Sequence, residues 1–100
     1  MPSYSVSVPH RLGLEAARAH VERFLDNFQR DYADQLSDVS VEWAENQLSF
    51  RFLARGLNIS GALVVEESLV RVSGSLPLAA ALFRGQIERT IREELSRLLT

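Results

Sequence analysis

The stretch "SVPHRLGLEAA" (residues 6–16) holds the residue types best suited to chemistry. His10 could act as a base, Arg11 could bind an anion, and Gly13 stands just before an expected helix. Free N–H groups at a helix N-terminus can bind anions, and an arginine beside them adds a planar fork of donors. A strand-to-helix corner, however, needs a strand stopper and a permissive glycine whatever the function. We favour this structural interpretation, and a binding or catalytic role for His10 is the alternative.

Three further residues are candidates for contact with a ligand or partner. Gly85 falls inside an expected helix, where glycine costs about 1 kcal/mol relative to alanine. We favour close packing of another element against Gly85, and the alternative is a gap that admits a ligand or partner. Trp43 and Phe83 supply large apolar surfaces. The candidate binding set is therefore His10, Arg11, Gly13, Trp43, Phe83 and Gly85.

The rest of the composition argues against most enzyme classes. The chain has no cysteine and only two histidines, so it predicts neither a thiolate site nor a three-histidine metal site. It contains no G-x-S-x-G elbow, no Gly-rich phosphate loop and no H-E-x-x-H motif. We therefore predict a non-enzymatic protein with no catalytic residue, no metal and no cofactor.

Charge and hydropathy narrow the range of partners. The net charge is −2, and the eleven basic residues, all arginine, are scattered among acids, which is not the pattern of a nucleic-acid-binding surface. An arginine-only surface could serve anion recognition, although a GC-rich genome explains it more simply. No stretch approaches the roughly 20 apolar residues of a membrane span, and the start of the chain lacks the pattern of a signal peptide. The expected location is the cytoplasm.

Hydrophobic periodicity predicts one α+β domain over residues 1–100. Alternation over residues 3–8 predicts a strand that Pro9 ends, and repeats at threes and fours from Leu14 to Tyr32 predict a helix of about five turns. Four short β segments follow between residues 39 and 74, with turns at 45–47, 55–56 and 66–68. A second long helix follows Pro77, with an apolar stripe formed by Phe83, Ile87, Ile91, Leu95 and Leu98.

The element order β-α-β-β-β-β-α predicts an antiparallel sheet in the order 2-3-4-5-1, with both amphipathic helices packed on one face. This fold is loosely similar to a shortened helix-grip domain, in which a curved sheet wraps a long C-terminal helix around a lipid pocket. The predicted core joins both helices to the middle strands through Val21, Phe24, Phe28, Trp43, Phe50, Phe83, Ile87 and Ile91.

The other face of the predicted sheet carries mostly small and hydroxyl side chains, among them Ser40, Ser49, Ser60 and Ala62. Few of the long charged side chains that usually coat an open sheet occur there. A flat surface of this kind suits a second copy, which makes a homodimer one interpretation. A solvated face is slightly favoured, and pairing of unprotected strand edges is a competing route to a dimer.

Several stretches taken together resemble the polyhydroxyalkanoic acid system protein family, namely "PHRLGLEAARAHVERF", "VEW", "LSFRF", "GLNISGAL" and "LFRGQIERTIREEL". These are small bacterial proteins associated with polyhydroxyalkanoate biosynthesis and granules. The resemblance implies a non-enzymatic accessory or binding protein of polyester storage, associated with the granule or its proteins, and it transfers no catalytic residue. The alternative is a small carrier or modest enzyme for hydroxyacyl, acyl-thioester or other lipid-like ligands. A carrier needs a cavity between helices and sheet, whereas a purely accessory protein is expected to be packed solid.

Overall fold

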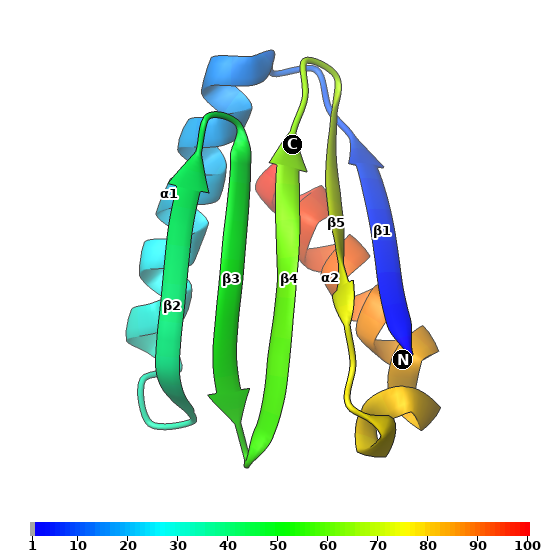
Figure 1. The fold of residues 1–100 in the computed structure, drawn as a ribbon. Coiled ribbons are helices and arrows are strands. Elements are labelled where there is room, and N and C mark those ends of the chain that lie inside the picture. Colours follow the sequence, from blue (N-terminus) through cyan, green and yellow to red (C-terminus); the bar gives the residue numbers. More distant parts are fainter. Residues whose placement is uncertain (1) are drawn as a thin grey trace.

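The computed structural model describes residues 2–100 as a five-stranded sheet with two helices on one face (Figure 1). The elements are β1 (Ser3–Pro9), α1 (Leu14–Asp31), β2 (Leu36–Ala44), β3 (Gln47–Ala54), β4 (Leu57–Val65), β5 (Leu69–Ser75), a 3₁₀ helix η1 (Leu78–Phe83) and α2 (Arg84–Leu98). Neighbouring strands are antiparallel and follow the order β1-β5-β4-β3-β2. The predicted α+β fold and the strand order are confirmed.

Tight turns join the four strands of the meander. Arg55 and Gly56 connect β3 to β4 with φ angles of 54° and 80°, the left-handed conformation that a two-residue hairpin turn requires. The strand β2 begins earlier than predicted, at Leu36, because Leu36 and Ser37 already pair with Ala54 and Leu53 of β3. An irregularity of the β2–β3 register follows between Ser37 and Ser40. Asp38 has a φ of 51° there, which is typical of a bulge on an edge strand.

The buried core lies mainly between α2 and the β1, β5 and β4 side of the sheet. Every second residue of β1 is buried, and α2 packs along this strand. The buried apolar residues are Tyr4, Val6, Val8, Ala17, Val21, Leu48, Leu63, Val65, Val70, Val72, Leu76, Ala80, Leu95 and Leu99. Of the predicted core, only Val21 is fully buried, and all the others except Phe83 are half-buried.

Two predictions about the start of the second helix are wrong. Phe83 is 56% exposed, because η1 extends past the end of the sheet, and its main contacts are with α2 (Figure 1). The α-helix itself begins only at Arg84, after the 3₁₀ turns that follow Pro77. Gly85 is also exposed, and a Cβ added there would meet no atom within 4 Å, so no element packs closely against it.

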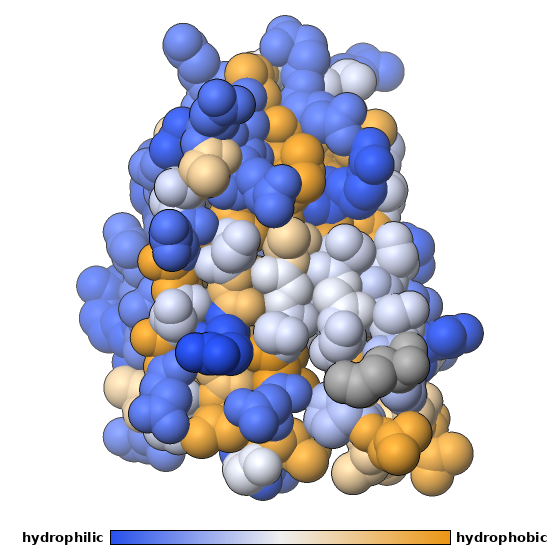
Figure 2. Space-filling view, in the orientation of Figure 1, coloured by the Kyte–Doolittle hydropathy of each residue, from blue (hydrophilic) through white to orange (hydrophobic). Residues whose placement is uncertain are grey.

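The opposite face of the sheet has the small side chains that the alternation predicts. The strand register aligns Ser5, Ser73, Ala62 and Ser49 in one row across β1, β5, β4 and β3, and Ser3, Ser75 and Ser60 in the next. We call these seven residues together with Ser40 the serine face. It forms the pale area over β4, β5 and β1 in Figure 2, between more hydrophilic regions. Among residues 2–100, no helix has the length and apolar character needed to cross a membrane.

Candidate functional site

His10 lies in the corner between β1 and α1 and is only 7% exposed. Its Nδ1 accepts a hydrogen bond from the Leu12 N–H at 3.2 Å, which assigns the ring proton to Nε2, and Nε2 donates to the Glu66 carbonyl at 3.0 Å. The His10 backbone N–H donates to the Ser68 carbonyl at 2.9 Å. The bonds to Glu66 and Ser68 join the corner to the β4–β5 turn, and the bond from Leu12 lies within the corner. Gly13 caps α1 with a φ of 83°, as the structural interpretation of this corner requires.

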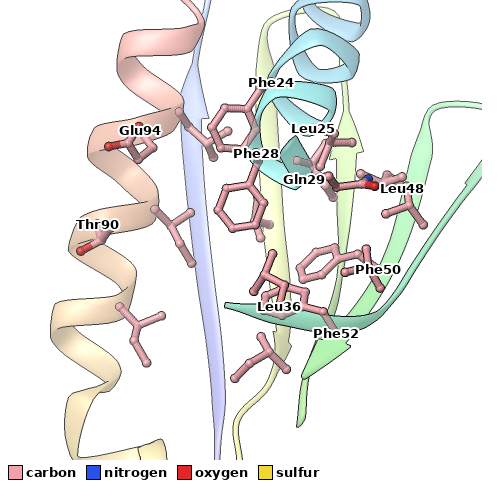
Figure 3. A pocket seen from close by; sticks show the side chains of 18 of the residues that line it. Phe24, Leu25, Phe28, Gln29, Leu36, Leu48, Phe50, Phe52, Thr90 and Glu94 are labelled. Atoms are coloured by element: carbon pink, nitrogen blue, oxygen red, sulfur yellow. The ribbon is translucent and has the colours of Figure 1, made fainter. Parts of the chain in front are cut away.

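An apolar cleft of about 370 Å³ lies between α1, α2 and the sheet (Figure 3). It exists because the two helices barely touch, so that the sheet between them is incompletely covered. Phe24, Leu25, Phe28 and Gln29 line it from α1, and Ile87, Thr90, Ile91, Glu94 and Leu95 line it from α2. The sheet side and its flanking loops contribute Tyr4, Leu36, Val39, Val41, Leu48, Phe50, Phe52, Ile59, Leu63, Val72 and Leu76.

A row of aromatic rings forms one wall of the cleft. On α1, Phe24 and Phe28 are one helical turn apart, and their ring centroids lie 5.8 Å from each other. The Phe28 ring lies 6.4 Å from Phe52 on β3, and Phe52 lies 6.2 Å from Phe50. Figure 3 shows Phe24 and Phe28 projecting from α1 into the space that separates it from α2. Such rings provide a large apolar surface with little conformational freedom.

The floor of the cleft is the ring of Tyr4, which lies over a pair of glycines. Gly61 and Gly74 face each other across β4 and β5, between Tyr4 on one side and Phe50 on the other. A Cβ at Gly61 would stand 2.5 Å from the Tyr4 Oη and 2.8 Å from the Phe50 Cζ, so only glycine leaves room for both rings. The Tyr4 hydroxyl donates to the Ser60 carbonyl at 3.1 Å, and burial raises the pKa of Tyr4 to about 12. The floor therefore stays uncharged at physiological pH.

Polar groups occur at only a few points of the lining. Besides Tyr4, the lining residues with polar side chains are Gln29, Thr90 and Glu94, which contribute mainly their carbon atoms, so the surface that faces the cleft is almost entirely apolar. In Figure 3 the Thr90 and Glu94 oxygens lie on the side of α2 away from Phe24 and Phe28, and Glu94 accepts a bond from Arg97 at 3.3 Å. The lining contains no arginine, histidine, serine or cysteine. No group of metal-ligating side chains was found within the part of the chain that the structure describes. This lining suits an uncharged aliphatic chain.

The six predicted binding residues do not form one site. His10, Arg11 and Gly13 occupy the corner at one end of the molecule, and Trp43 lies on β2 with the Arg18 guanidinium 4.5 Å from its ring centre. Phe83 and Gly85 lie at the other end, where η1 meets α2 (Figure 1).

None of the six lines the main cleft. Phe83 borders a shallow groove that continues from the cleft and shares Ile87, Thr90 and Ile91 with it. The predicted interface residues, Ser40, Ser49, Ser60 and Ala62, lie on the serine face, on the other side of the sheet.

The sequence interpretation gave a cavity between helices and sheet only as the alternative, for a carrier, because the residues of the cleft look like core. Phe24, Phe28 and Phe50 were expected to fill the space between helices and sheet, and they line it instead. A cleft wall and a packed core need the same apolar periodicity, so the pattern does not separate them. The one signal available was the number of large aromatic rings on α1 and β3. These rings present more apolar surface than one further helix can cover.

A comparison with protein families connects this geometry to a biological system. The model of the family described as "Putative polyhydroxyalkanoic acid system protein" matches residues 5–99. The chain belongs to this family. The match runs from within β1 to the end of α2, so it includes both helices and every residue that lines the cleft except Tyr4. No curated protein and no solved structure matches the chain.

Proposed function

We propose that this polyhydroxyalkanoic acid system protein is a non-enzymatic accessory protein of bacterial polyester storage that binds an uncharged acyl chain in its cleft. The observation that carries the proposal is the size and lining of the cleft. Small-molecule sites enclose roughly 300–1,000 Å³ and combine a mostly apolar wall with a few polar groups. A cleft of about 370 Å³ with aromatic walls meets the conditions of size and apolar lining. The requirement stated for a carrier, a cavity between helices and sheet, therefore supports binding as the molecular role.

The apolar lining favours a particular chemical class. The surface that faces the cleft is almost entirely hydrocarbon, so it favours ligands whose buried part is an uncharged alkyl or acyl chain. A free carboxylate ligand would find no cation in the lining and would lie near Glu94, which disfavours it. Uncharged esters, including short polyester segments, therefore fit the cleft better than fatty acid anions do.

Calorimetric titration with methyl esters of 3-hydroxy acids of increasing chain length tests the proposal. Burial of each added methylene should contribute about 0.8 kcal/mol to the binding free energy, so the affinity should rise about fourfold per methylene until the cleft is full. The matching free acids should bind more weakly. An affinity that does not depend on chain length would contradict the proposal.

A variant that fills the cleft locates the binding. Ile91→Trp places a bulky ring between the helices and should reduce ester affinity by about tenfold or more. The control is Ala19→Trp on the exposed side of α1, which should bind like the parent. Thermal unfolding of both variants checks that they are folded. Equal ester binding by the two variants would place the ligand elsewhere.

The proposal includes a cytoplasmic, granule-associated homodimer that pairs through the serine face. The aligned rows of small side chains permit close approach of a second sheet. The strand edges are less suited to pairing: the Ser5 N–H at the outer edge of β1 donates to Glu88 Oε2 at 2.9 Å, and β2 carries its bulge.

Light scattering tests the dimer. Arginines at Ser60 and Ala62 together should dissociate it and leave the core untouched. A parent chain that is monomeric throughout the micromolar range would contradict this part. Fractionation of native granules tests the association with them.

A further inference from the structure

The 3₁₀ helix η1 presents large apolar side chains to solvent. Leu82 is 92% exposed, Leu78 is 81% exposed and Phe83 is 56% exposed. We call these three residues the η1 corner. They lie beyond the end of the sheet, and the same region is orange at the lower right of Figure 2. Single exposed apolar side chains are common, but three of this size on one short 3₁₀ helix, unsupported by any strand, indicate a surface that something covers.

The charge around the η1 corner indicates what kind of surface covers it. Residues 69–87 contain no aspartate or glutamate, although the chain has thirteen acidic residues. The two basic residues of this stretch are Arg71, which is paired with Glu66 at 2.5 Å, and Arg84, which follows the corner. The next acidic residue, Glu88, accepts a hydrogen bond from the Ser5 N–H at 2.9 Å. A corner without carboxylates pays little desolvation penalty on an apolar phase. One arginine is far fewer than the four to eight basic residues typical of segments that bind anionic bilayers.

The η1 corner is continuous with the cleft. Phe83 borders the shallow groove formed with Gln86, Ile87, Thr90 and Ile91, and the last three of these also line the cleft. A surface in contact with Phe83 would therefore lie at the entrance to the cleft. A chain that leaves this surface could enter the cleft without crossing water.

We infer that the η1 corner rests on the uncharged surface of a hydrophobic polyester and holds the entrance of the cleft against it. The identity of the polyester rests on the proposed function. The contact is reversible, because three side chains provide limited apolar surface and even a single fatty acyl anchor binds membranes only marginally. The corner brings the protein to the polymer, and the cleft takes a chain segment from it.

Co-sedimentation of the full chain with poly(3-hydroxybutyrate) particles tests the inference, with zwitterionic and anionic phospholipid vesicles as parallel arms. Leu82→Asp and Leu82→Gln should each weaken binding to the particles about tenfold or more, because either change removes the most exposed anchor. The glutamine variant separates loss of apolar contact from added charge. Ala19→Asp, on the exposed side of α1, adds the same charge away from the corner and should bind like the parent.

The outcomes separate this inference from the proposed function. Parent-like binding by both Leu82 variants would overturn it, as would tighter binding of the parent to anionic vesicles than to polyester. Binding of soluble esters without any binding to the particles would overturn the inference about the η1 corner and leave the proposed cleft binding intact. Leu82-dependent binding to the particles without any ester binding would support the corner and refute the cleft. Because Leu82 is 92% exposed, thermal unfolding of its variants should match the parent.

Discussion

The helices cover one face of the sheet, but they cover its β1 half more fully than its β2 half. In β1 the residues alternate strictly between buried and exposed, whereas no residue of β2 is fully buried. Both strands have alternating apolar residues, but α2 lies along β1, while α1 and α2 leave the cleft open over β2 and β3. We call the first region the packed half and the second the cleft half. The difference shows that helix placement, and not strand pattern, decides whether an apolar strand face becomes core or binding surface.

The largest expected effect lies at the junction of the two halves. Gly61→Val should lower the free energy of unfolding by about 3 kcal/mol or more, since its Cβ would overlap both the Tyr4 hydroxyl and the Phe50 ring. Neither ring can move away without opening the sheet face or filling the cleft. Urea unfolding followed by circular dichroism measures the change. A loss below about 1 kcal/mol would mean that the floor of the cleft is not tightly packed.

A pair of truncations on α1 compares the halves directly. Val21 is fully buried, and Leu25, one turn later, lines the cleft and is half-buried. Val21→Ala should cost about 2 kcal/mol, from the two lost methyl groups and the void they leave. Leu25→Ala removes more atoms, yet it should cost only about 1 kcal/mol because they already face open space. If Leu25→Ala costs more than Val21→Ala, the cleft is closed in solution.

Most of the fold follows from local signals, and the site does not. The alternation of Tyr4, Val6 and Val8, the two-residue turn at Arg55–Gly56 and the periodicity of α1 each depend on neighbours in sequence, so they predict the strand order. The separation of α1 from α2 depends on contacts between distant elements, which periodicity does not encode. Phe83 illustrates this limit, since its spacing to Ile87 predicts burial, whereas the position of η1 beyond the sheet leaves it exposed.

Alkaline pH should weaken the packed half through Tyr4. Burial raises the pKa of Tyr4 from 10.0 to about 12 in the folded protein, so below pH 10 both folded and unfolded chains hold the proton. Between pH 10 and 12 only the unfolded chain loses it, and the free energy of unfolding should fall by roughly 2 kcal/mol. Tyr4→Phe should remove this part of the pH dependence, at the cost of about 1 kcal/mol at neutral pH for the bond to Ser60. Parallel pH profiles for the two proteins would contradict the assignment to Tyr4.

The smallest expected effect is an increase in the free energy of unfolding, and it concerns Gly85, a glycine in an exposed environment. Gly85 lies in the first turn of α2, is exposed, and has a backbone that any residue can adopt, because its φ is not positive. Gly85→Ala should therefore raise the free energy of unfolding by about 0.5 kcal/mol, since alanine restricts the unfolded chain and its Cβ meets no neighbour. Gly61→Ala, the same change over the floor of the cleft, should destabilise the protein. Urea unfolding of the two variants side by side gives the sign of each change. A destabilising Gly85→Ala would indicate that another surface, such as a second copy of the chain, approaches the start of α2 in solution.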